Sequence, residues 1–165
     1  MSEGKKRILV IDKDLLAEMV ADQLNKYDEF KVFTAGNLGE AVSMIREAKF
    51  DLIVVEHFLA YGSAYELLKG ESDPRMFYGA PRLIKFVREN LRINPPFVLI
   101  GSDPGLLNQS RQKFEIPAER VFLTPYSSFS FEKIVCDILA VECRLADDFI
   151  ADEMNDHKSR RYFQD

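Results

Sequence analysis

Four groups of polar residues each follow a short apolar run of the sequence, and their types and positions could support chemistry. They are Asp12-Lys13-Asp14, Glu56-His57, Gly101-Ser102-Asp103 and Thr124-Pro125. Carboxylates bind hard divalent cations, but such cations need several oxygen ligands, and the Lys13 ammonium opposes them. Asp14 is placed to cap the helix predicted after it. A histidine beside a carboxylate can act as a general base, but we expect His57 to be a surface loop residue.

The short apolar runs alternate with stretches of helical periodicity, which is typical of βα units and a parallel sheet. Strands are predicted at Arg7–Ile11, Lys31–Thr34, Asp51–Val55, Phe97–Ile100 and Arg120–Leu123. Helices are predicted at Leu15–Lys26, Leu38–Ala48, Pro81–Asn90, Gly105–Phe114 and Phe131–Met154. In such a sheet the functional crevice lies beyond the carboxyl ends of the strands. The four polar groups are therefore expected at that edge.

Two segments exceed what a minimal domain of this kind needs. The connection at about 57–80 is far longer than the roughly two to six residues usual between a strand and its helix, and a short extra helix is expected near Ser63–Lys69. We expect a core domain at 1–139. The last helical pattern continues beyond it over 140–154, and a charged tail follows at 155–165. The candidate interaction residues in these segments are Phe58, Tyr61, Tyr65, Phe77, Tyr78, Leu145, Phe149 and Ile150.

The composition of the chain excludes several classes of function. The chain has 165 residues and a formal net charge of -5, so its surface repels the phosphate backbone, and nucleic-acid binding is not expected. No apolar run approaches the roughly 20 residues that span a bilayer, and the polar start is no signal peptide, so we expect a cytoplasmic protein without membrane contact. No glycine-rich phosphate cradle supports a ligand in the crevice. Neither a cofactor nor a bound metal is predicted.

The stretch from about Lys5 to Leu139 resembles the bacterial response-regulator receiver family. The resemblance rests on Ile8-Leu9-Val10-Ile11-Asp12, on Phe50-Asp51-Leu52-Ile53-Val54-Val55 and on Pro125. It implies an α/β, flavodoxin-like fold with a five-stranded parallel sheet in the order 2-1-3-4-5. It also implies phosphorylation of an aspartate after strand three. That chemistry uses a metal-binding acidic pair after strand one, a Ser or Thr after strand four, and a Lys before the proline that follows strand five.

Nearly every part of that chemistry is altered in this chain. Lys13 stands at the second metal-binding position, and Glu56 stands at the acceptor position with a side chain one methylene too long. In-line phosphoryl transfer tolerates little misplacement. Gly101 most naturally occupies the hydroxyl position, although a one-residue slip would place Ser102 there. Thr124 replaces the lysine. Lys13 and Glu56 are expected to form an ion pair in place of the metal contact.

These changes occur together, so we interpret the chain as a pseudo-receiver without enzyme activity. It is predicted to act as a protein interaction module in bacterial signal transduction, through the inserted segment and the last helix. The apolar stripe of that helix either packs over the inserted segment or joins a second copy or another protein. The alternative is an atypical receiver phosphorylated by a histidine kinase or a small phosphodonor on Glu56 or another carboxylate.

Overall fold

A computed structural model of the chain describes residues 4–13, 16–59 and 79–144. Its strands are β1 (Lys6–Ile11), β2 (Phe30–Ala35), β3 (Leu52–Glu56), β4 (Phe97–Gly101) and β5 (Val121–Leu123). They form a five-stranded sheet in the order β2-β1-β3-β4-β5, which confirms the predicted fold class. The chain divides into two compact units, Met1–Phe97 and Val98–Asp165.

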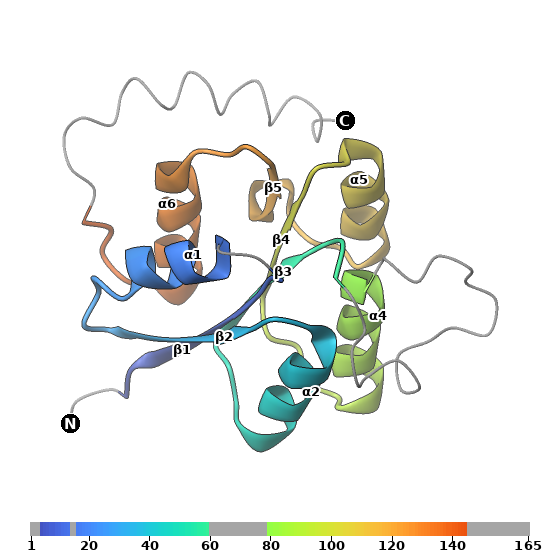
Figure 1. Cartoon of the computed structure of the whole chain (residues 1–165), viewed down its shortest axis with the longest axis horizontal. Helices are drawn as coiled ribbons and strands as arrows, with labels where there is room; N and C mark the ends of the chain where they lie inside the picture. Colours follow the sequence, from blue (N-terminus) through green and yellow to red (C-terminus); the bar gives the residue numbers. More distant parts are fainter. Residues whose placement is uncertain (1–3, 14–15, 60–78, 145–165) are drawn as a thin grey trace. The chain divides into compact units, whose positions relative to one another are not determined.

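The first unit is built around β1, which pairs in parallel with both β2 and β3. Ile8 to Ile11 are buried because strands flank β1 on both edges and helices cover its faces. Figure 1 shows α1 (Leu16–Leu24) and α2 (Leu38–Glu47) on opposite faces of β1 and β2. The sequence fixes the start of α2, because the Asn37 side chain accepts a hydrogen bond from Glu40 N at 3.0 Å, and Glu40 Oε2 accepts one from Gly36 N at 2.7 Å.

The predicted helix at Pro81–Asn90 is present but changes its hydrogen bonding midway. It begins as α4 (Gly79–Lys85) and continues as a π-helical turn, η2 (Phe86–Asn90). Residue 79 must be glycine, because a Cβ there would collide with the Leu38 side chain and lie 2.7 Å from the carbonyl oxygen of Leu59. The close approach of α4 to α2 therefore depends on a missing side chain.

The second unit contains α5 (Pro104–Lys113), the short 3-10 turn η3 (Ala118–Arg120) and α6 (Ser128–Leu139). β4 pairs in parallel with β5. Asp103 Oδ1 caps α5 by accepting from Leu106 N at 3.0 Å, and Ser127 Oγ caps α6. Its apolar core includes three rings whose centroids lie 5.5 to 5.6 Å apart, those of Phe122, Tyr126 and Phe131.

The predicted continuous helix from Phe131 to Met154 is corrected, because α6 begins at Ser128 and ends at Leu139. Ala140 has a left-handed backbone with φ 54°, and Val141 N donates to Cys136 O at 3.0 Å, which is the hydrogen bond of a Schellman helix end. The extension predicted for 140–154 is therefore not helical at 140–144. Residues 145–165 lie outside the described residues. Within the described part of the chain, no helix is long and apolar enough to cross a membrane.

Candidate functional site

The carboxyl ends of β1 and β3 bring two acidic residues together in the first unit. Asp12 directly follows β1, is 6% exposed, and donates its backbone N–H to Ala35 O at 3.1 Å. Glu56 is the last residue of β3, and its side chain is half-buried with Oε2 enclosed. The register pairs Ile11 with Val55, and one further step along both strands places Asp12 beside Glu56. The strand edge at which a crevice was predicted thus carries two neighbouring acidic residues.

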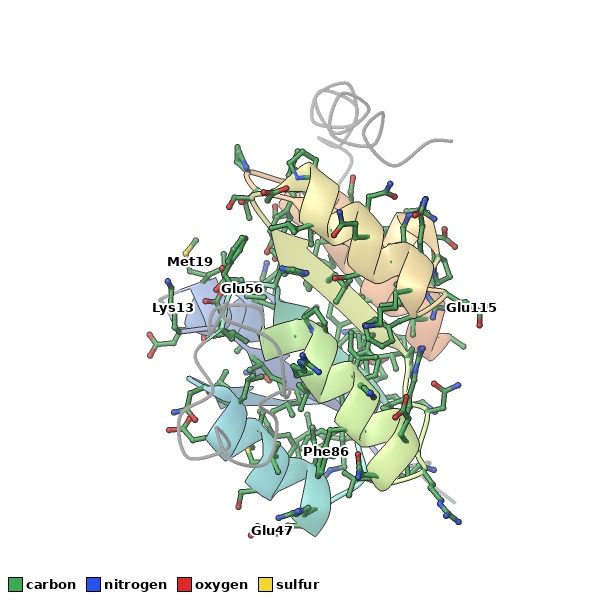
Figure 2. The ribbon with its side chains drawn as sticks, turned by 90° about the vertical axis from the view of Figure 1, so that its right-hand side faces the viewer. Lys13, Met19, Glu47, Glu56, Phe86 and Glu115 are labelled. Atoms are coloured by element: carbon green, nitrogen blue, oxygen red, sulfur yellow. The ribbon has the colours of Figure 1, made fainter. Side chains whose placement is uncertain are left out.

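Lys13 does not pair with Glu56 in the way its position predicts. It is exposed, and among the described residues it forms no ion pair with Glu56. Figure 2 shows Lys13 at the surface of this unit, on the side that also carries Met19. An exposed ammonium keeps its hydration, whereas an ion pair with a half-buried carboxylate would remove part of it. The expected Lys13–Glu56 ion pair is therefore wrong for this structure.

The expectation that His57 is a surface residue is also wrong. His57 is 1% exposed and its Nδ1 atom is enclosed. Its ring meets the ring of Phe58 edge to face, with centroids 5.5 Å apart. The apolar residues that follow, Phe58 and the fully buried Leu59, were a signal that the chain stays in the core beyond β3. Phe58 is half-buried, so this candidate interaction residue contributes partly to packing.

The remaining candidate residues of the inserted and terminal segments lie outside the described residues, and so does Asp14 of the crevice. These interaction residues are Tyr61, Tyr65, Phe77, Tyr78, Leu145, Phe149 and Ile150. The short helix expected near Ser63–Lys69 falls there as well.

In the second unit, the hydroxyl of Thr124 donates a hydrogen bond to a backbone carbonyl. β4 ends at Gly101, which pairs with Leu123 of β5. The Gly101 carbonyl accepts from Thr124 N at 2.8 Å and from Thr124 Oγ1 at 3.2 Å. Ser102 follows the strand and is exposed, and Pro125 is exposed after a cis peptide bond. The last residue of β4, Gly101, therefore has no side chain. The hydroxyl of Thr124, directly after β5, already donates a hydrogen bond to Gly101 O.

The carboxylates near these strand ends can be compared with the number of oxygen ligands that a metal ion requires. Hard cations take six or more oxygen ligands in all, several of them from protein carboxylates. Among the described residues, no group of three or more His, Cys, Asp or Glu side chains is placed to hold a metal ion.

Two exposed apolar side chains in the described residues were missed by sequence reasoning. Met19 of α1 is 67% exposed and Ile93, after η2, is 40% exposed. For Met19 the signal was available, because it falls outside the stripe that α1 buries. That stripe consists of Ala17, Val20, Ala21 and Leu24.

Comparison with known proteins gives matches among solved structures. The receiver domain of HemR from Leptospira biflexa superposes with a TM-score of 0.62 at 19% identity, covering 86% of this chain and 100% of that domain. Chemotaxis protein CheY4 of Vibrio cholerae gives 0.59 at 17%, covering 82% and 99%. Response regulator TrrA of Thermotoga maritima, solved with magnesium and beryllium fluoride, gives 0.58 at 15%, covering 81% and 98%. The chain has the receiver fold.

No family model and no curated protein matches the sequence. At identities of 15 to 19% the likeness to these receivers concerns the fold. At the carboxyl ends of its strands this receiver fold has Lys13, Glu56, Gly101 and Thr124.

Proposed function

We propose that this receiver fold is a non-catalytic protein interaction module whose phosphorylation chemistry has been lost. The observation that carries the proposal is the set of side chains at the carboxyl ends of its strands. Lys13 replaces a carboxylate, Glu56 replaces an aspartate, Gly101 lacks a hydroxyl and Thr124 lacks an ammonium. One such change could tune a reaction, but four together remove its parts.

The replacements remove positive charges that phosphoryl transfer requires. A phosphoryl group carries about two negative charges, and a receiver neutralises them with a metal ion and a lysine. Here Lys13 stands where a metal-binding carboxylate would be needed, and its ammonium is exposed at the surface. Thr124 brings no positive charge, and its hydroxyl donates to Gly101 O. A transition state at this edge would therefore lack most of its electrostatic stabilisation.

The proposed partner is a protein in bacterial signal transduction or a second copy of the chain. The aromatic residues of the inserted segment and the apolar residues beyond Leu139 supply the contact in this proposal. Met19 adds an exposed apolar side chain on α1. Light scattering of the full chain and of a chain ending at Arg144 tests self-association. A dimer that becomes a monomer on truncation supports contact through residues 145–165, and an unchanged mass assigns the contact elsewhere.

The loss of phosphorylation chemistry is tested with magnesium and beryllium fluoride, the additions present in the TrrA structure. Beryllium fluoride is a tetrahedral analogue of a phosphoryl group. We expect no saturable change in the amide NMR signals of Asp12, Glu56, Gly101 or Thr124. The matched control restores the family residues with Lys13→Asp, Glu56→Asp and Thr124→Lys, with and without Gly101→Thr. It is expected to gain a saturable response.

A saturable response of the unmodified chain would support the alternative, an atypical receiver that is phosphorylated. The closeness of Asp12 and Glu56 by strand register is the observation that favours this alternative. In that case the response should be centred on these two residues and should require magnesium.

A further inference from the structure

The first unit contains a second candidate site, an open pocket at the amino ends of β3 and β4. Its volume is about 440 Å³, within the range of about 300–1,000 Å³ typical of small-molecule sites. β3 runs from Leu52 to Glu56, so this pocket and the Glu56 carboxylate lie at opposite ends of one strand. In Figure 2, Glu47 at the end of α2 lies far from Lys13 and Glu56. The pocket is lined by Ile45, Lys49, Phe50, Asp51, Ile53, Ile93, Asn94, Pro95 and Pro96.

The walls of this pocket are held in place by backbone hydrogen bonds. Ile53 N donates to Pro96 O at 3.0 Å, which joins β3 to the segment before β4. Asp51 N donates to Arg7 O at 2.8 Å, and Asp51 Oδ2 accepts from Arg7 N at 2.7 Å. The ring of Phe50 is 5% exposed and packs edge to face on Phe33. The cavity is therefore largely pre-formed, as small-molecule sites usually are.

The π-helical turn produces the outer wall. Leu91 N donates to Phe86 O at 3.1 Å and Ile93 N donates to Val87 O at 3.2 Å, and Arg92 between them is left-handed with φ 55°. This wide turn ends the helix and leaves Ile93 40% exposed at the pocket. Water contact with such a side chain is unfavourable at about 25 cal/mol per Å² of apolar surface. A bound apolar group would remove that contact.

The polar groups of the pocket favour a ligand that accepts hydrogen bonds. Lys49 and Asn94 are exposed at its rim, and within the described residues neither side chain forms a hydrogen bond or an ion pair. The one carboxylate of the lining, that of Asp51, accepts the Arg7 N–H and keeps its negative charge, so the ligand's own carboxylate must lie on the Lys49 and Asn94 side of the pocket. Hydrogen-bond donors thus remain available beside the apolar side chains of Ile45, Phe50 and Ile93.

We propose that this pocket binds a small amphipathic carboxylate with an aromatic or branched apolar body. The carboxylate accepts charge-assisted hydrogen bonds from Lys49 and a further one from the Asn94 amide. The apolar body lies against Ile45, Phe50 and Ile93. This site is separate from Asp12 and Glu56 and is independent of the proposed protein interaction. It gives the fold a ligand-binding site at the end of β3 opposite to Glu56.

The test is an NMR titration of the full chain, with phenylacetate as the probe and phenylacetamide as its neutral counterpart. A ligand of this size is expected to bind with a dissociation constant of about 1 mM. Saturable shifts should centre on the methyl groups of Ile45, Ile53 and Ile93. Phenylacetamide should bind about three- to tenfold more weakly, because it lacks the charge that Lys49 recognises.

Two variants and a control make the assignment specific. Lys49→Gln should weaken phenylacetate binding about three- to tenfold and leave phenylacetamide binding unchanged. Ile93→Ser should weaken both probes, since it removes apolar wall. Lys26→Gln changes an exposed lysine away from the pocket lining and should change neither. The proposal is overturned if the shifts do not saturate, if they lie outside the pocket, or if Lys49→Gln and Lys26→Gln behave alike.

Discussion

The end of α6 at Leu139 can be tested by replacing the residue that follows it. Ala140 has φ 54°, and this left-handed backbone costs a residue with a Cβ about 1–2 kcal/mol relative to glycine. Glycine in turn gains about 0.5–1 kcal/mol of conformational freedom in the unfolded chain. Ala140→Gly should therefore stabilise the protein by about 0.5–1 kcal/mol. For a chain of this length that raises Tm by roughly 1–4 °C.

A continuous helix from Phe131 to Met154 predicts the opposite sign. Residue 140 would then lie in a helix interior, where glycine is about 1 kcal/mol less favourable than alanine. Urea and thermal unfolding followed by circular dichroism measure the change. Glu115→Gly is the positive control, because Glu115 has φ 53° and Ile116 N donates to Arg111 O at 2.9 Å, as at the end of α6.

A control for glycine inside a helix comes from α5. Gln109→Gly lies in its interior and should destabilise the protein by about 0.5–1 kcal/mol. If Ala140→Gly lowers stability as Gln109→Gly does, while Glu115→Gly raises it, the helix end at Leu139 is refuted.

Three further substitutions test the local structure around the strand ends and α2. Gly79→Ala should destabilise by about 1–3 kcal/mol in urea unfolding, because its Cβ would meet Leu38 and Leu59 O; a change under about 0.5 kcal/mol would contradict the close approach of α4. Thr124→Val should cost about 0.5–1.5 kcal/mol through loss of the hydrogen bond to Gly101 O, whereas Thr124→Ser retains it. Equal stability of the two Thr124 variants would count against that bond. Asn37→Ala should lower thermal stability by about 1 kcal/mol as the α2 cap is lost, and an unchanged Tm would argue against the cap.

The sheet was predictable because its signal is local. Short apolar runs marked every strand to within one residue at each end, and the polar residues after them mark the carboxyl ends of the strands. Central strands such as β3 are covered on both faces, so nearly all of their side chains must be apolar. The strand order came from the family resemblance, since periodicity alone does not define which strands pair.

The features that sequence reasoning missed depend on backbone geometry and tertiary contacts. The apolar stripe beyond Leu139 keeps helical spacing, but Ala140 adopts a left-handed conformation usually taken by glycine, so no glycine marks the helix end. The π-helical turn at Phe86–Asn90 has an ordinary helical sequence. The pocket at Lys49 and Ile93 arises where distant segments meet, and no motif encodes it. Lys13 has the charge to pair with Glu56 but remains exposed.

The central claim is that a receiver fold has lost its phosphorylation chemistry, and intact-protein mass measurement after incubation with acetyl phosphate and magnesium tests it most directly. A receiver domain with the complete set of family residues, reacted in the same mixture, shows that the reagent is active. The account predicts that the mass of this chain stays unchanged over the whole time course. A time-dependent, magnesium-dependent gain of one phosphoryl mass, abolished by Glu56→Gln or by substitution of Asp12, would contradict it.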